Sequence, residues 1–455
     1  MPKTLTMEDR GRMMLEDRVS SVIPRLALPS IISMLISSIY NMADTFFVGR
    51  ISTTASGAVG VVFSAMSIIQ AIAFTFGMGS GANMSRCLGS HEDERAVRFA
   101  HLGFFSSFFT GFILCALGLL FLEPIVRFLG ATPTILPEAM SYATWIFLAA
   151  PFMMGTFTLN NLLRFQGLAL YGTIGTGIGG ILNMFLDPLL IFIFHMGVTG
   201  AALATAISQV VSFVILVTIT NTRKDALSLT PKGLHWNGRM FVEILYNGMP
   251  SLGRQGIASV ATILLNNTAA AWGDPAIAAM SIVSRCVMFI NSAVIGFGQG
   301  FQPVCAYCYG AGRYRRVREA FIFCIKVSTV ILVVIGGIFL LISGNVIQFF
   351  RDDPEVIEIG TLALRLQLCT LPLWGLITMS NMYSQSIGLG GRATLIAAAR
   401  QGIFLIPLLL ILPRTLGLLG LQAAQPIADI LTFIFTLILV RAMTREMMNK
   451  TERTT

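Results

Sequence analysis

Two carboxylates interrupt long apolar stretches of the sequence: Asp44 in YNMADTFFVGR and Asp187 in NMFLDPLL. Tyr40 and Asn41 precede Asp44 by four and three residues, so in a helix they share its face. Asn183 stands in the same relation to Asp187. An ionisable side chain inside a membrane costs roughly 3 kcal/mol on insertion scales, which makes each carboxylate a candidate functional group.

The chemistry of these two carboxylates depends on whether they meet. Side by side in a low dielectric, they cannot both ionise cheaply, so the pair would hold a proton or bind a hard cation such as Na⁺ through oxygen ligands. If they do not meet, each is a carboxylate that is hydrogen-bonded for structural reasons alone. We predict the first case, in which Asp44 and Asp187 form an ion-coupling site for H⁺ or Na⁺, with no other metal and no cofactor.

Prolines accompany both carboxylates. Pro29 lies earlier in the stretch that carries Asp44, and Pro188 directly follows Asp187. A proline inside a helix removes one backbone hydrogen bond and clashes with the preceding turn, so a bend is expected at each position. A bend beside a titrating group can act as a conformational switch, although static bends are equally common. We assign Pro29 as the bend of the first membrane helix.

Three arginines also lie deep within apolar stretches: Arg254, Arg285 and Arg400. The residues alone leave three roles open for them. They can pair with Asp429, which lies in the last apolar stretch, line a water-filled cavity, or bind an anionic substrate. We place Arg254 and Arg285 in the substrate cavity.

The composition requires a membrane around these residues. Only 12% of the 455 residues are charged and 55% are hydrophobic, whereas a soluble domain has about 25% charged residues. Apolar runs of about 20 residues recur along the chain, and each must be a helix because lipid cannot hydrogen-bond the backbone. The seven cysteines are scattered, and the Cys305–Cys308 pair lacks the second pair that a zinc site needs.

Twelve such runs are expected to cross the membrane, and no cleavable signal is expected before the first. Their approximate spans are 24–48, 57–82, 100–122, 140–163, 170–194, 198–220, 244–270, 278–304, 319–342, 358–386, 393–412 and 418–441. The predicted organisation is an N-terminal segment (1–23), a first six-helix bundle (24–220), a linker (221–243), a second six-helix bundle (244–441) and a C-terminal tail (442–455).

Basic residues indicate the orientation of these helices. Lys and Arg concentrate in the termini, the linker and alternate loops, and Arg164 at the end of the fourth run is counted on that side. The opposite side holds only Arg50, Arg127, Arg351 and Arg414. By the positive-inside rule both termini are cytoplasmic, in the inner (plasma) membrane. The same rule accounts for the net charge of +9 without a nucleic-acid partner, and we expect a monomer in the lipid bilayer.

The two bundles repeat one unit. At an offset of 221 residues the halves share Pro29 with Pro250 and Gly79 with Gly300. Further identities include Gly89/Gly310, Asn160/Asn381 and, with one residue less, Gly197/Gly417. An even number of helices per unit makes the copies parallel, related by a pseudo-twofold axis along the membrane normal. Transporters of this kind rock two bundles about a central site.

Several longer segments carry family-like motifs: MADTFFVGR, FGMGSGANMSRCLG and the stretch from LLRFQGLALYG to LDPLLIF in the first half, with GFGQGFQPVCAYCYGAGRYRRV and AARQGIFLIPLLLILP in the second. Together they resemble the multidrug and toxic compound extrusion (MATE) family over roughly residues 20–440. The resemblance implies twelve helices in two lobes that form a V. It also implies antiport of H⁺ or Na⁺ against drug-like, often cationic, organic molecules.

Within that family the sequence resembles the DNA-damage-inducible (DinF) branch more than the NorM branch. The resemblance carries a polar cluster of the first lobe onto Tyr40, Asp44, Tyr142, Asn160, Asn183, Asp187 and Thr205. It assigns Thr205 to the ion site, and we group Tyr142 and Asn160 with Asn41 in the substrate cavity. Pro29 matches the proline that bends the first helix in that branch.

Other functions fit the sequence less well. The main alternative is a flippase or exporter of a lipid or lipid-linked substrate in the same superfamily, whose deep arginines would bind pyrophosphate. A NorM-type ion site in the second lobe is not expected, because Ala258 and Leu376 replace its carboxylates. A membrane enzyme is not expected either, since the sequence has no HExxH, nucleophile elbow or paired metal-ligand motif. No filter-like segment repeats, as a channel would require.

Overall fold

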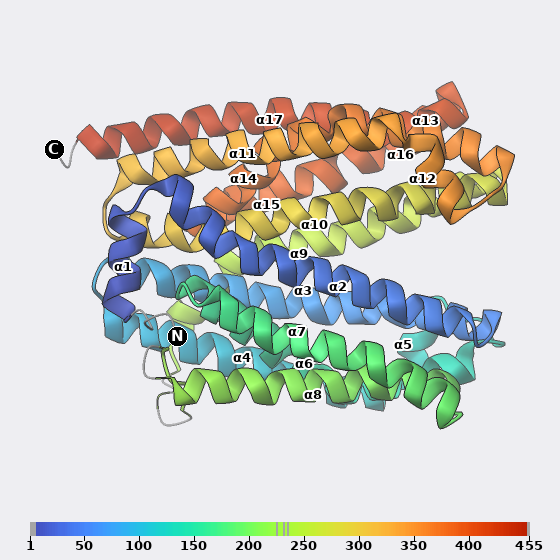
Figure 1. Ribbon diagram of the computed structural model, residues 1–455, viewed down its shortest axis with the longest axis horizontal. Coiled ribbons are helices and arrows are strands. Elements are labelled where there is room, and N and C mark those ends of the chain that lie inside the picture. Colours follow the sequence, from blue (N-terminus) through green and yellow to red (C-terminus); the bar gives the residue numbers. More distant parts are fainter. Residues whose placement is uncertain (1–5, 224–225, 231–232, 234–235, 453–455) are drawn as a thin grey trace.

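In the computed structural model, every regular element among the described residues is a helix, and the long helices run roughly parallel (Figure 1). The structure describes residues 6–223, 226–230, 233 and 236–452, without the side chains of residues 41, 42, 45, 46, 49, 53 and 446–452. Eleven of the described helical segments are long and apolar enough to cross a membrane. The expected all-α membrane fold is therefore confirmed.

The first bundle consists of six long helices and two short ones. They are α1 (Met7–Glu16), α2 (Val19–Gly49), α3 (Thr53–Gly89), α4 (Asp93–Leu120), α5 (Leu122–Phe128), α6 (Leu136–Phe165), α7 (Ala169–Pro188) and α8 (Gly197–Thr222). A π-helical turn, Leu189–Ile193, continues α7 directly after Pro188. Since Pro188 has no backbone N–H to donate, a change of hydrogen-bond pattern at this point is expected.

The second bundle follows a similar order. Its helices are α9 (Gly238–Ala269), α10 (Asp274–Gly310), α11 (Tyr314–Leu341), α12 (Ser343–Phe350), α13 (Pro354–Thr370), α14 (Trp374–Ser386), α15 (Gly390–Ala398), α16 (Leu405–Leu416) and α17 (Leu418–Glu452). A 3₁₀ turn (Ala270–Trp272) follows α9, another (Leu371–Leu373) joins α13 to α14, and a π-helix (Ala399–Phe404) joins α15 to α16. Together with α9, the eleven apolar segments correspond to the twelve expected spans.

Helix α9 differs from the other long helices in its polarity. It begins at Gly238, earlier than the expected residue 244, and carries Asn247, Arg254 and Gln255 in its interior. These polar residues keep α9 out of the set that is apolar enough to span a membrane by composition alone. Such a helix needs neighbours on several sides, and α9 packs against both α3 and α15.

The outer surface of the molecule is apolar, as a lipid environment requires. On α11, the side chains of Val330, Val334, Ile338 and Leu341 follow one another at helical spacing and are between 53% and 85% exposed. A contiguous apolar stripe of this length on a monomer indicates a surface that is covered by something other than water. The chain is therefore a multi-pass membrane protein.

The two bundles cross each other through glycines at equivalent positions of the repeat. Helix α2 packs against α10, and α9 packs in the same way against α3. A Cβ on Gly300 would overlap the backbone of Ala27 in α2. At the equivalent position, a Cβ on Gly79 would overlap the backbone carbonyl of Ile244 in α9. Such close approach of two helix backbones requires residues without side chains.

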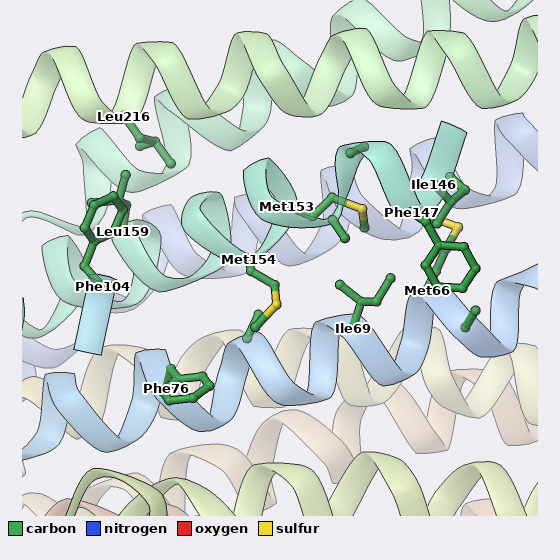
Figure 2. Packing of buried hydrophobic residues seen from close by; sticks show 14 of the residues in the cluster. Met66, Ile69, Phe76, Phe104, Ile146, Phe147, Met153, Met154, Leu159 and Leu216 are labelled. Atoms are coloured by element: carbon green, nitrogen blue, oxygen red, sulfur yellow. The ribbon is translucent and has the colours of Figure 1, made fainter. Parts of the chain in front are cut away.

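Each bundle has its own core of buried apolar side chains. Figure 2 shows part of the first core, where Met66, Phe104 and Leu216 come from three different helices. The beginning of α2 is an exception, because Ile23 and Leu26 belong to the core of the second bundle. Separate close-packed cores favour movement of each bundle as a unit. The beginning of α9 is the counterpart of the beginning of α2, because Met240 and Ile244 belong to the core of the first bundle. Helices α2 and α9 are the elements that such a movement would have to bend or tilt.

Helix α1 connects the two bundles at the end of the molecule where the last turns of α17 also lie (Figure 1). We call this end the terminal face. The Nε of Arg10 donates to the carbonyl of Gln166 in the first bundle at 3.0 Å. The Nε of Arg316 in the second bundle donates to the carbonyl of Met14 at 2.7 Å. Both bundles are thus hydrogen-bonded to the same short helix.

Candidate functional site

A cavity lies inside the first bundle, between α2, α6, α7 and α8. Its polar lining includes Tyr40, Asn160, Arg164, Asn183, Thr205 and Gln209. The space open to water is about 60 Å³, and each water needs at least about 10–15 Å³ of it. In this conformation the cavity therefore holds a few waters, whereas sites for drug-sized molecules are typically about 300–1,000 Å³.

Asp187 is fully buried on α7 beside this cavity. The side-chain amide of Asn183 donates to Oδ1 of Asp187 at 3.5 Å and to the hydroxyl of Thr205 at 3.3 Å. Oδ2 of Asp187 and Oδ1 of Asn183 are buried and accept no hydrogen bond from any described residue. A buried acceptor without a donor is unfavourable, so a proton or a cation at this point would stabilise the site.

Helix α2 brings the second carboxylate to the same place. Asp44 lies within electrostatic range of Asp187, and its Oδ1 is also buried without a donor among the described residues. The phenols of Tyr40 and Tyr142 lie within range of both carboxylates. Tyr142 also lies next to the side chain of Thr205. Four helices, α2, α6, α7 and α8, thus place one polar cluster around the pair.

This geometry fits an ion site better than two structural carboxylates. A carboxylate held for structure alone is expected to have donors on both oxygens, yet Asp44 and Asp187 each keep a buried oxygen without one. Two neighbouring carboxylates with amide and hydroxyl oxygens can share a proton or coordinate a hard cation. Among the described residues, no group of three or more His, Cys, Asp or Glu side chains forms a metal centre.

The backbone of Pro29 on α2 is hydrogen-bonded to α7, on the other side of the cavity. The hydroxyl of Thr173 on α7 donates to the carbonyl of Pro29 at 2.8 Å. One turn further, the hydroxyls of Ser33 and Thr176 lie 3.2 Å apart, and Asn160 donates to Thr176 at 3.4 Å. Helix α2 continues through Pro29 without interruption. Any tilt of α2 at Pro29 would therefore be transmitted to α7 through these contacts.

The residues predicted for the substrate cavity occupy different positions. Asn160 lines the cavity. Tyr142 does not line the cavity, but it is 1% exposed and lies next to the lining residue Thr205. Arg285 is exposed on α10 and is not among the residues around the cavity. The side chain of Asn41 lies outside the part of the chain that the structure describes.

Arg164 is the functional candidate that sequence reasoning missed. We counted it among the cytoplasmic loops, but it lies in the last turn of α6, is 2% exposed and lines the cavity. Its Nη2 donates to Oδ1 of Asn161 and contacts the sulfur of Met78. Arg254, on α9, lies within electrostatic range of it. The available signal was the spacing of four residues from Asn160, which puts Arg164 on the same helix face.

The second bundle contains a buried acid that is fully paired. Asp429 on α17 accepts hydrogen bonds from Nε of Arg400 at 2.8 Å, Nε1 of Trp374 at 2.8 Å and the amide of Gln425 at 3.0 Å. The guanidinium of Arg400 also stacks 3.6 Å from the ring centroid of Trp374. Of the three roles open to Arg400, pairing with Asp429 is the one observed. Both oxygens of Asp429 have donors, so this cluster offers no ion site.

Comparisons with known proteins agree with this architecture. The chain is similar to Multidrug export protein MepA of Staphylococcus haemolyticus (strain JCSC1435), 27% identical over 429 residues and 94% of each chain. It is also similar to Multidrug export protein MepA of Staphylococcus aureus (strain MSSA476), 29% identical over 417 residues, 91% of this chain and 92% of that protein.

A solved structure has the same fold. It is described as the outward-facing conformation of a multidrug resistance MATE family transporter of the MOP superfamily, with a TM-score of 0.92, 24% identity, and coverage of 97% of this chain and 99% of that one. The family model MatE matches residues 29–189 in the first bundle and 250–411 in the second. Since these matches cover more than half of the sequence and repeat in both bundles, the chain belongs to the MatE family.

Proposed function

We propose that the chain is a secondary active multidrug exporter, which exchanges H⁺ or Na⁺ for drug-like, often cationic, organic compounds. Members of the family are transporters, and the chain is a transporter rather than an enzyme. The proposal rests above all on Asp44 and Asp187, which lie together beside a cavity and each keep a buried acceptor oxygen without a donor. The relatives' names, multidrug export protein, support the same substrate class.

Exchange follows from competition for one negative charge. With Asp44 and Asp187 free of ions, the cavity attracts a cationic compound. When the pair takes up a proton or Na⁺, its charge falls and the compound loses its electrostatic partner. Each ligand therefore weakens the binding of the other, and this negative coupling is reciprocal. A transporter needs such coupling to exchange ion for drug.

Helix α2 is the element that we propose to move. Its beginning packs in the core of the second bundle, while Asp44 reaches the ion site of the first. Neutralising the pair would favour a different tilt of α2 at Pro29, and Thr173 would transmit the tilt to α7. The cavity has space for only a few waters, which corresponds to a conformation with a narrow cavity. A change in the tilt of α2 would widen the cavity.

We propose that the terminal face is cytoplasmic and that the chain is a monomer in the plasma membrane. Basic residues concentrate on that face, as the positive-inside rule requires. The two bundles also approach closely near this face. Gly89 approaches the backbone of Tyr307 and, at the equivalent position of the repeat, Gly310 approaches the backbone of Arg86. These contacts support a rocking movement of the bundles about the terminal face. Export then requires opening of the opposite end.

A second candidate function is movement of a lipid or lipid-linked substrate. The buried Arg164 and its neighbour Arg254 favour it, because a pyrophosphate would satisfy both charges. In that case Arg164→Ala and Arg254→Ala would abolish transport and Asp44→Asn would be tolerated. Ion-coupled drug export predicts that Asp44→Asn abolishes transport.

The direct test is ethidium export in everted vesicles from cells that lack their own pumps, with pH and Na⁺ gradients imposed separately. We expect export driven by one gradient in the wild type, which identifies the ion, and none in Asp44→Asn protein that is present at equal amount and elutes as a folded species. Full gradient-driven export in Asp44→Asn and Asp187→Asn would contradict the proposal.

A further inference from the structure

Arg164 carries a buried positive charge that no carboxylate of the described residues neutralises. Its side chain is 2% exposed, and its polar contacts are the amide oxygen of Asn161 and the sulfur of Met78. Its Nε is buried without a hydrogen-bond partner among the described residues. A guanidinium has five N–H donors, so most of its capacity is unused. Removing a charge from water without a partner is strongly unfavourable.

A second guanidinium adds to this positive charge. Arg254 on α9 lies within electrostatic range of Arg164, and it forms no ion pair with a carboxylate among the described residues. Arg400 is a buried arginine of the same protein with a structural role. It is paired with the carboxylate of Asp429 and stacks on the ring of Trp374. By this internal standard, Arg164 lacks a negatively charged partner.

The carboxylate pair lies beside the same cavity, next to the lining residues Asn183 and Thr205. Asn160, one turn from Arg164, is hydrogen-bonded to Thr176, and Asp187 lies eleven residues beyond Thr176, about 17 Å along α7. Side chains lean toward the N-terminus of their own helix, and α6 and α7 run in opposite directions, so Arg164 and Asp187 lean toward each other.

We propose that Arg164, assisted by Arg254, is an anion subsite of the cavity, which binds the carboxylate of an exported compound. The guanidinium of Arg164 binds this carboxylate, and the cationic part of the same compound lies on the side of Asp44 and Asp187. The planar fork of arginine matches a carboxylate in a bidentate manner, which favours this anion. This assignment rests on the proposed export function and narrows its substrate class.

The test is a binding measurement with two probes that differ by one charge. Tetramethylrhodamine carries a free carboxylate and is a zwitterion, whereas its methyl ester is a cation of nearly the same shape. Binding to the purified full chain is followed by fluorescence anisotropy. In Arg164→Gln we expect the affinity for the zwitterion to fall about tenfold, or about 1.4 kcal/mol, with the affinity for the ester within about twofold of the wild type.

Two further variants control for charge and for packing. Arg414→Gln removes an exposed arginine of α16 and should change neither affinity. Arg164→Lys keeps the charge but not the fork, so its loss for the zwitterion should lie between those of the wild type and Arg164→Gln. If Arg164→Gln and Arg164→Lys weaken the affinity for both dyes equally, Arg164 has a structural role. If the affinity for the zwitterion is unchanged, Arg164 has no role in binding. Either result overturns the proposal.

Ethidium, a cation without an anionic group, separates this inference from the proposed function. If ethidium is exported under an ion gradient but Arg164→Gln binds both dyes like the wild type, only the anion subsite is wrong. If ethidium is not exported by folded protein but the zwitterion still depends on Arg164, the subsite stands and ion-coupled drug export is wrong.

Discussion

In the first bundle, Asp44 and Asp187 keep buried oxygens without donors beside a cavity, whereas in the second bundle Asp429 is bonded on both oxygens by three side chains. The two bundles arise from one repeat and match the same family model. Their difference therefore lies in a few side chains rather than in the fold. An unsatisfied buried acid is suited to bind and release an ion, while a fully bonded one is suited to hold helices together.

The repeat identifies which residues make this difference. In the register of Gly197 and Gly417, Asp429 corresponds to Gln209. Gln209 lines the first cavity, and its buried side-chain oxygen has no hydrogen-bond partner among the described residues. Arg400 falls opposite Gly179 or Gly180, and both glycines line that cavity. A glycine leaves space where the second bundle has a guanidinium. The cavity of the first bundle thus exists where the second bundle is filled by an ion pair.

The largest effect is expected from the carboxylates of the first bundle. Asp44→Asn and Asp187→Asn should each reduce gradient-driven export by 100-fold or more, on the order of 3 kcal/mol, while thermal stability changes little. Because the two carboxylates act as one site, the double variant should be no worse than either single one. Initial export rates in proteoliposomes measure this.

The matched control for that experiment is a buried amide beside the pair. Asn183→Ala removes the donor to Asp187 and Thr205 but keeps both carboxylates, so it should weaken export partially. If the losses of the two Asp→Asn variants multiply in the double variant, the carboxylates work independently and a shared ion site is wrong.

The next effect is on stability, in the second bundle. Asp429→Asn leaves Arg400 without its counter-charge and should destabilise the protein by about 3 kcal/mol. The side chain of Arg400 is mostly but not fully covered, at 17% exposed, which keeps the loss at the lower end for a buried pair. The double variant Arg400→Met with Asp429→Leu should recover most of the stability. Thermal unfolding in detergent provides the measurement, and no recovery in the double variant would contradict the account.

The glycine crossings should respond alike in both bundles. Gly79→Ala and Gly300→Ala each place a Cβ onto the backbone of the other bundle and should cost about 1–3 kcal/mol. Gly60, on α3, has open space around it, so Gly60→Ala should stabilise the helix by about 0.4–1 kcal/mol. Unequal effects at Gly79 and Gly300, measured by thermal unfolding, would show that the crossings are not equivalent.

The smallest effect concerns α1, which is bonded to both bundles. The hydroxyl and the backbone N–H of Thr6 hydrogen-bond the carboxylate of Asp9 and hold its pKa below the usual range. A lowered pKa contributes stability above the unfolded value, and this contribution is lost as the pH falls below about 4. Hydrogen exchange of α1, corrected for intrinsic rates, should speed up at about pH 3 but not at pH 6. Asp9→Asn removes the titrating group and should abolish the difference.

Much of the first bundle's site could be predicted from the sequence. Helical spacing groups Asp187 with Asn183, and the resemblance adds Thr205, which the structure places in the same cluster. This prediction succeeds because Asn183 and Asp187 lie on one helix, where spacing determines which side chains share a face. Thr205 follows from the family resemblance instead. The apolar runs and the repeat predict the membrane fold for the same local reason.

Contacts between distant helices could not be predicted in this way. Arg400 and Asp429 are 29 residues apart and Trp374 and Asp429 are 55 apart, so no periodicity relates them. Arg164 was misplaced because a basic residue at the end of an apolar run has the pattern of a loop residue. Only the packing of α6 against α3 shows that its side chain is turned into the bundle.

The central claim is that ion coupling resides in the first bundle alone, and ion release on substrate binding tests it most directly. Ethidium is added to purified protein in weakly buffered solution, and released H⁺ or Na⁺ is measured with a pH indicator or an ion-selective electrode. The account predicts release by the wild type and by Arg400→Lys, and none by Asp187→Asn. Release by Asp187→Asn equal to that of the wild type, or its loss in folded Arg400→Lys, would contradict the claim.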